Sequence, residues 1–259
     1  MPALLKQALG GLILALSFSS RLPAEKLLPP EDLPEFSRAF AWLPLAGLII
    51  SLLALVPLAL LKEIAADGAG SGWLLAWFYL TLYIWLTRAL HWDGLADIAD
   101  GLGSNKSGAA FWRAVKDSKL GAVGGIALLL AGAGYLVCGQ SLIADGHMLA
   151  LAWAAAAGRA FALFIPSFAP HNGKPGLGET LAAANLFGAA LAWLCALAVI
   201  GIFLFSLLTL LVTIISGLGV VFCLSRAAQK HGGFNGDFIG AGIVLAELAA
   251  LLAASLCLK

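Results

Sequence analysis

Long apolar runs, separated by short polar segments, dominate the chain. Four of these runs carry no charged residue: 39–61, 68–87, 120–144 and 181–225. A helix needs about 20 apolar residues to cross roughly 30 Å of hydrocarbon, so each of the first three runs predicts one transmembrane helix. The last run, at 45 residues, is too long for one helix and predicts a helical hairpin.

Two more predicted spans each hold a single ionisable residue near the middle. They cover about residues 148–168, around Arg159, and residues 238–258, around Glu247. The first apolar stretch, residues 3–19, is borderline and either spans the membrane or lies at its surface. The pattern therefore predicts an all-α polytopic bundle of about seven transmembrane helices, or eight if the first stretch spans, and no strand alternation competes with it.

Composition excludes a water-soluble protein. Of the 259 residues, 61% are hydrophobic and 11% are charged, and the mean hydropathy is +0.97. So few charged side chains cannot cover the surface of a soluble globule of this size. We therefore assign residues 1–259 to a single membrane domain embedded in a lipid bilayer. The formal net charge of +1 gives no sign of a nucleic-acid partner.

The basic residues fall on one side of the predicted membrane. Loops at about residues 20–38, 88–119, 169–180 and 226–237 hold most of the Lys and Arg residues, whereas the intervening connections hold Lys62 and almost no other. Positively charged loops face the cytoplasm. Because the crossings alternate, all four basic loops are expected on the cytoplasmic side, and the polar site with them.

The longest polar loop opens with the run HWDGLADIADG at residues 91–101. Asp93, Asp97 and Asp100 are spaced four and then three residues apart, which places three carboxylates on one face of a helix. Such carboxylates repel one another, and Mg²⁺ or Mn²⁺ would relieve the repulsion. Mg²⁺ held in this way shares its other positions with phosphate oxygens, which indicates phosphoryl chemistry. The alternative is a solvated helix with Asp93 as its N-cap.

A basic amphipathic segment follows at residues 111–121. Its Trp and Phe beside Arg and Lys are typical of a helix at the headgroup level of a membrane. In the functional interpretation, Arg113, Lys116 and Lys119 bind a pyrophosphate, and Asp117 adds a fourth metal ligand.

Two glycine-rich loops, residues 172–179 and 231–237, are either ordinary turns or places where backbone approaches a ligand. In the second loop, Asp237 either caps the last helix or contacts a ligand. Arg159 and Glu247 lie at similar depth in their spans, where an isolated charge costs about 2.5–3.5 kcal/mol. We expect the two side chains to pair inside the bundle. The alternative is that Arg159 contacts the substrate directly.

Taken in order along the chain, these motifs resemble the cobalamin synthase family, adenosylcobinamide-GDP ribazoletransferase. The specific match is the run at residues 91–101, and the matches cover essentially the whole chain. The shorter matches are residues 20–23 (SRLP), 36–38 (FSR), 44–47 (PLAG), 117–121 (DSKLG), 124–125 (GG), 158–159 (GR), 236–237 (GD) and Glu247. Residues 97–101 (DIADG) also resemble half of the DxxDG signature of the CDP-alcohol phosphotransferases, but the second half is not found as such.

The resemblance implies a multi-pass enzyme of the prokaryotic plasma (inner) membrane that acts in the last steps of cobalamin synthesis. A hydroxyl of α-ribazole, or of its 5′-phosphate, attacks the cobinamide-side phosphorus of adenosylcobinamide-GDP. GMP then leaves, and Mg²⁺ is required. Pyrophosphate cleavage needs a metal on the phosphates and cations for the charge of the leaving group, so the residues and the resemblance agree.

The expected site combines these residues by role. His91, beside the first acid, is a candidate general base because its unperturbed pKa is about 6.5. The full set is as follows: His91 and Asp117 in catalysis; Asp93, Asp97, Asp100 and Asp117 as metal ligands; Arg21, Arg38, Arg113, Lys116, Ser118, Lys119, Arg159 and Asp237 in substrate binding; Arg159 and Glu247 as paired buried charges.

Two other classes of protein use similar features. A CDP-alcohol phosphotransferase or an aspartate-rich prenyltransferase would use the same acids on a lipid substrate. A transporter would use Arg159 and Glu247 as a midplane site, but the acids cluster at the membrane edge and no inverted repeat is found. The sequence leaves open the oligomeric state, the number of metal ions, the general base and the preferred lower-ligand nucleotide.

Overall fold

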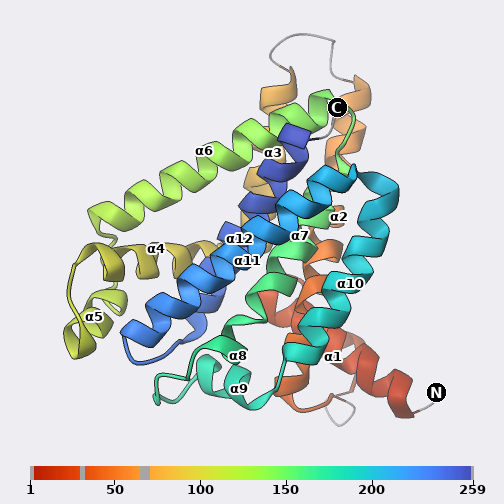
Figure 1. Cartoon of the computed structure of the whole chain (residues 1–259). Helices are drawn as coiled ribbons and strands as arrows, with labels where there is room; N and C mark the ends of the chain where they lie inside the picture. The colour runs from red at the N-terminus through yellow and green to blue at the C-terminus, as the bar shows by residue number, and fades with distance from the viewer. Residues whose placement is uncertain (1–2, 30–32, 65–70, 258–259) are drawn as a thin grey trace.

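The computed structural model describes residues 3–29, 33–64 and 71–257, and within them the fold is a bundle of helices without an extended strand (Figure 1). Residues 68–70 and 258 of the predicted spans lie outside the described residues. Within the described residues, six helical segments are long and apolar enough to cross a membrane. They contain α2 (Leu43–Ile64), α6 (Ala122–Ala144), α7 (Leu149–Ala162) with α8 (Ile165–Phe168), α10 (Phe187–Leu204), α11 (Leu207–Lys230) and α12 (Gly236–Cys257).

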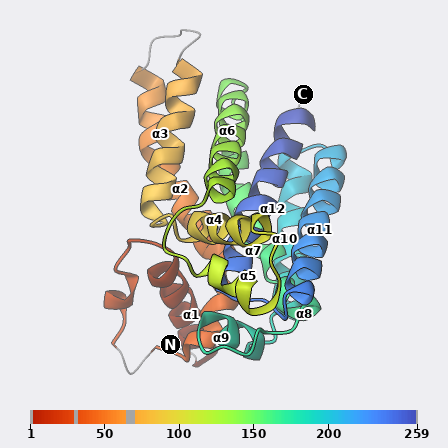
Figure 2. The same cartoon turned by 90° about the vertical axis from the view of Figure 1, so that its left-hand side faces the viewer.

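The seventh apolar helix, α3 (Ser71–Leu86), ends in a sharp bend. It meets α4 (Leu90–Gly103) at an angle of 89°. The turn holds Arg88 and Ala89 in left-handed backbone, with φ of 55° and 54°, a conformation that residues other than glycine rarely adopt. Because of this bend, α4 runs nearly perpendicular to α3 and crosses below α3 and α6 (Figure 2). The predicted all-α polytopic fold is confirmed.

The short elements gather at the same end of the bundle as α4. These are η1 (Ala24–Leu27), η3 (Phe36–Trp42), α5 (Gly108–Val115) and α9 (Leu177–Ala183). We call this end, which carries the basic loops predicted from the sequence, the basic end. The borderline helix α1 (Ala3–Ser19) also lies here, packed against η1, η3 and α2, whereas the end of α12 lies at the opposite end (Figure 1).

Helix α7 is the centre of the bundle, because it packs against α12, α2 and α10 and its residues from Ala150 to Ala162 are buried. Small residues allow this close packing, as is typical of helices in a membrane. A Cβ atom on Gly158 would lie 2.7 Å from the Cβ atom of Glu247, and one on Gly47 would lie 2.5 Å from the side chain of Arg159.

The two charges predicted to pair inside the bundle do lie together. Nη1 of Arg159 is 3.5 Å from Oε2 of Glu247. The hydroxyl group of Tyr83 joins them: it accepts a hydrogen bond from Nη1 of Arg159 at 2.9 Å and donates to Oε2 of Glu247 at 3.0 Å. This network ties α3, α7 and α12 together. Arg159 is fully buried, so it holds the bundle together beneath the basic end.

Loss of one member of this pair is expected to destabilise the protein. In Arg159→Leu or Glu247→Leu, the remaining charge is buried alone, which costs about 3–5 kcal/mol. The double variant should recover much of the thermal stability in detergent, and Glu63→Leu, at an exposed position, should leave it unchanged. Strictly additive losses in the double-mutant cycle would show that the two charges do not stabilise each other.

Candidate active site

Two glycines let α4 cross α12 with their backbones in contact. A Cβ atom on Gly94 would lie 2.9 Å from the carbonyl oxygen of Asp237, and one on Gly240 would lie 3.3 Å from the Cα atom of His91. Larger residues at either position would therefore push the helices apart. The crossing brings Asp93 of α4 and Asp237 of α12 to the edge of one cavity.

Two cavities flank α4 at the basic end. The inner cavity holds about 230 Å³ and lies between α4, α12, the loop at residues 171–178 and the residues Phe18 and Phe40. The outer cavity holds about 550 Å³ and lies between α4 and residues 115–120. Asp93 and Lys116 line both cavities. Asp93 and Lys116 are thus the two residues that the linings of both cavities share.

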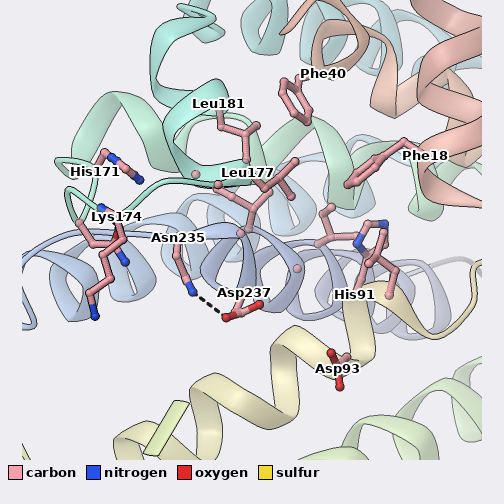
Figure 3. Close-up of a pocket in the computed structure, with 18 of the residues that line it drawn as sticks. Phe18, Phe40, His91, Asp93, His171, Lys174, Leu177, Leu181, Asn235 and Asp237 are labelled. Carbon is pink, nitrogen blue, oxygen red and sulfur yellow. Dashed lines mark hydrogen bonds between the residues drawn. The ribbon is translucent and has the colours of Figure 1, made fainter. Parts of the chain in front are cut away.

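The inner cavity has an apolar wall and a polar floor (Figure 3). In the view of Figure 3, Phe40, Leu181 and Phe18 lie above, and Asp237 lies below them beside the polar side chain of Asn235. His91 rises from α4 toward Phe18, whereas Asp93 points away on the other side of the helix. His91 and Asp93, two residues apart on α4, therefore point to opposite sides of the helix.

The outer cavity collects most of the polar residues that the sequence placed around a pyrophosphate. Asp97 and Asp117 line it together with Lys116, Ser118 and Lys119. The turn after α5 is fixed by a hydrogen bond of 3.1 Å from the backbone N–H of Lys119 to Oδ1 of Asp117. Carboxylates and ammonium groups therefore face one another across this cavity.

The carboxylates on α4 crowd one another. Burial, together with the nearby carboxylates of Asp93, Asp237 and Asp100, raises the pKa of Asp97 to about 6. Among the described residues, however, no three His, Cys, Asp or Glu side chains form a ready metal site. Mg²⁺ commonly uses one or two carboxylates and completes its shell with water and substrate phosphates. Asp93 and Asp97, one helical turn apart, fit a site of that kind.

Asp100, expected to be a third metal ligand, is engaged elsewhere. Its Oδ2 accepts a hydrogen bond from the N–H of Gly121 at 2.7 Å, and its Oδ1 accepts one from the N–H of Gly124 at 2.7 Å. These N–H groups belong to the start of α6, where a carboxylate is stabilised by the helix dipole. Asp100 thus ties α4 to α6.

The four arginines expected to bind substrate, Arg21, Arg38, Arg113 and Arg159, line neither cavity, and Arg159 is instead paired with Glu247. Nε of Arg21 donates to the carbonyl oxygen of Trp85 at 2.7 Å, and its guanidinium lies 5.1 Å from the centre of the Trp85 ring. Nη1 of Arg38 donates to Oε1 of Gln7 at 2.9 Å. Arg113 is exposed on α5. Arg21 therefore attaches the N-terminal segment to α3, and Arg38 ties η3 to α1.

His91, the candidate general base, is buried at the inner cavity. Burial and the nearby Arg159 hold the pKa of the His91 imidazole well below its usual range, so the ring is neutral at pH 7. Its Nε2 atom has no hydrogen-bond partner within the described part of the chain. A neutral ring with a free nitrogen can exchange a hydrogen bond with a ligand.

The two glycine-rich loops pair with each other. The N–H of Phe234 donates to the carbonyl oxygen of Pro170 at 2.8 Å, and the N–H of Asn172 donates back to Phe234 at 3.1 Å. Gly233 is required here because its φ is +128° and a Cβ atom would lie 2.7 Å from the Pro170 oxygen. This pairing brings His171, which sequence reasoning did not single out, to the inner cavity.

Asn235 takes one of the two roles left open for Asp237, the capping of α12. Its Oδ1 accepts a hydrogen bond from the N–H of Phe238 at 3.3 Å, so Asn235 caps α12. Its Nδ2 donates to Oδ2 of Asp237 at 2.6 Å and holds that carboxylate on the floor of the inner cavity. Asp237 is therefore free of the capping role, and its carboxylate faces the cavity.

These features define a polytopic membrane protein with a polar site at one end, where acidic and basic side chains face two adjoining cavities. The family model described as cobalamin-5-phosphate synthase matches residues 11–255. The chain belongs to this family and is a membrane transferase of cobalamin biosynthesis.

The chain is similar over nearly its full length to proteins named adenosylcobinamide-GDP ribazoletransferase. It is 35% identical to the one from Nitratidesulfovibrio vulgaris (strain DP4), over 99% of this chain and 100% of the relative. It is 35% identical to the one from Thiobacillus denitrificans, over 96% of each chain, and 33% identical to the one from Klebsiella pneumoniae (strain 342), over 92% of this chain and 96% of the relative. No solved structure gives a significant match.

Asp97 and Asp100 are expected to respond oppositely to the same substitution. Asp100→Asn replaces an acceptor oxygen with an amide that faces an N–H group, so thermal stability in detergent should fall by about 1–3 kcal/mol. Asp97→Asn should leave stability unchanged or raise it at pH 7, because the raised pKa shows that the fold disfavours this carboxylate. Equal melting temperatures for Asp100→Asn and the wild type would contradict the anchoring role.

Proposed function

We propose that this enzyme transfers the adenosylcobinamide phosphate group from adenosylcobinamide-GDP to α-ribazole, or to its 5′-phosphate, and releases GMP. The observation that carries the proposal is the pair of cavities that flank α4 and share Asp93 and Lys116 in their linings, because a transfer between two substrates needs neighbouring sites for them. The names of the relatives, which match over nearly the full chain, supply the substrates.

The reaction exchanges one phosphorus–oxygen bond for another. The hydroxyl oxygen of the acceptor bonds to the cobinamide-side phosphorus, and the bond from that phosphorus to the bridging oxygen breaks. GMP leaves with the bonding electrons, and the hydroxyl proton passes to a nearby base or to water. Charge builds up on the diphosphate oxygens, so preorganised cations beside them lower the barrier.

The outer cavity is suited to hold the diphosphate. Lys116 lines both cavities, and Lys119 and Ser118 line the outer cavity. These side chains would donate charge-assisted hydrogen bonds to the phosphate oxygens. Asp117 faces them from the same turn and would contact the diphosphate through a cation.

We extend the proposal to Mg²⁺, held by Asp93 and Asp97 and completed by phosphate oxygens. When bound, the ion would neutralise charge on the diphosphate. The carboxylate crowding that raises the pKa of Asp97 supports this, since a cation there would relieve the repulsion. Asp100 holds α4 in place for this site through α6.

The acceptor side would be served by His91. Its free Nε2 atom and neutral ring suit it to take a hydrogen bond, and then a proton, from a hydroxyl group. We also propose that the basic end faces the cytoplasm of a prokaryotic plasma membrane, because the Lys and Arg residues gather there.

The reaction is tested with purified enzyme in lipid nanodiscs. With adenosylcobinamide-GDP, α-ribazole and Mg²⁺, we expect a cobamide and GMP in equal amounts, measured by chromatography. Removal of divalent cations with EDTA should abolish both products, and added Mg²⁺ should restore them. Product formed from CDP-diacylglycerol or a prenyl pyrophosphate, with none from the cobinamide substrate, would contradict the proposal.

The metal and phosphate assignments are tested by substitution. Asp93→Asn and Asp97→Asn keep side-chain size but remove charge, and each should lower the rate by about 10²–10³-fold, as should Lys116→Gln. The matched control is Asp145→Asn at an exposed position between α6 and α7, which should keep the full rate. Near-normal turnover of the Asp97→Asn enzyme at saturating Mg²⁺ would refute the metal assignment.

A further inference from the structure

We propose that the inner cavity binds the acceptor nucleoside, with the base against the apolar wall and the ribose on the polar floor, and that this wall selects an apolar bicyclic base. This inference rests on the proposed function, and it assigns one cavity to each substrate.

Size separates the two substrates. The inner cavity holds about 230 Å³, which is below the range of about 300–1,000 Å³ that is usual for drug-sized ligands. A corrin macrocycle with an attached nucleotide cannot enter such a space. The acceptor is a single nucleoside and is the smaller of the two substrates, so the inner cavity suits it. The donor must then approach from the outer cavity and the surface beyond.

The upper wall of the inner cavity matches an apolar base. Phe18 and Phe40 pack edge to face, with ring centroids 6.2 Å apart, and Leu177 and Leu181 complete the wall. The base of ribazole is a dimethylated benzimidazole, which has no amino or carbonyl group on its ring edge. A purine or pyrimidine with such groups would leave them without hydrogen-bond partners against this wall, and that is costly. The wall therefore favours benzimidazole over the common bases.

The floor of the inner cavity matches a ribose. Nε2 of His91 is buried and has no hydrogen-bond partner within the described residues, although the side chain lines the cavity and is only 7% exposed. Asp237, fixed by the hydrogen bond from Asn235, lines the same cavity, and His91 lies closer to Phe18 (Figure 3). Ribose hydroxyl groups can donate to the carboxylate and exchange a hydrogen bond with the imidazole. The unpartnered nitrogen thus gains a partner when the ligand binds.

This placement also brings the reacting atoms together. Asp93 and Lys116 line both cavities, so a ribose on the floor of the inner cavity would place its hydroxyl group on the side of these shared residues. The phosphorus would lie beside these shared residues and the GMP leaving group on the outer side. Attack and departure would then occur from opposite sides of the phosphorus, as in-line transfer requires.

The test compares Michaelis constants for the two substrates. Leu177→Trp fills the inner cavity and should raise the KM for α-ribazole at least tenfold while changing the KM for adenosylcobinamide-GDP less than twofold. Leu120→Trp lies at an exposed position that lines the outer cavity. This variant should raise the KM for adenosylcobinamide-GDP at least tenfold while changing the KM for α-ribazole less than twofold. Leu177→Phe, a smaller change, serves if the Trp variant does not fold.

Direct binding provides a second readout. α-Ribazole should bind to wild-type enzyme in nanodiscs without the donor, and His91→Ala should weaken this binding at least tenfold while binding of adenosylcobinamide-GDP is kept. If wild-type enzyme makes cobamide but both Leu177 variants keep a normal KM for α-ribazole, the cavity assignment is wrong and the proposed function stands. If wild-type enzyme makes no cobamide from these substrates, the proposed function itself fails.

Discussion

The backbone contact between α4 and α12 is the constraint on which the polar site depends. Gly94 and Gly240 lie at the crossing, and neither has room for a side chain. In a membrane, the lipid tails are as apolar as the helix surfaces, so burying apolar side chains between helices gains no hydrophobic free energy. Helices there associate through such close packing of small residues. Since α4 crosses α12 at this point, its acids lie beside the basic loops and the two cavities.

The same crossing divides the site into two compartments. His91 and Asp93 are two residues apart on α4, so they point to different sides, and Asp93 contributes to the lining of both cavities. Two further contacts hold α4 in this position: Asp100 caps α6 at one end, and the left-handed turn at Arg88 and Ala89 connects to α3 at the other. A cavity on each side of one rigid helix gives two substrates a shared boundary, which suits a group transfer.

Much of the fold follows from the sequence, because runs of about 20 apolar residues have few alternatives to a spanning helix. The helical spacing of Asp93, Asp97 and Asp100 also predicted a common face, and the opposite charges of Arg159 and Glu247 predicted a pair.

Other features depend on tertiary contacts that residue spacing does not encode. N–H groups at the start of α6 donate hydrogen bonds to both carboxylate oxygens of Asp100, and the Tyr83 hydroxyl joins the buried pair. Likewise, the sequence does not show which group a basic side chain will bind. Arg21 and Arg38 were expected to bind substrate, but they form hydrogen bonds within the protein. The pairing of the loops around Pro170 and Phe234 links segments more than 60 residues apart, and their glycines were the only local signal.

The central claim is that the glycine crossing builds the transferase site, and one added methyl group tests it most directly. Alanine normally stabilises a helix relative to glycine, by about 1 kcal/mol. Gly132→Ala on α6, where a Cβ atom would meet nothing within 4 Å, should therefore keep both stability and the rate of cobamide formation. Gly94→Ala, whose Cβ atom would lie 2.9 Å from the Asp237 carbonyl oxygen, should instead lower the rate at least tenfold while the protein still inserts and purifies as a folded protein. A Gly94→Ala enzyme with the wild-type rate would contradict the account.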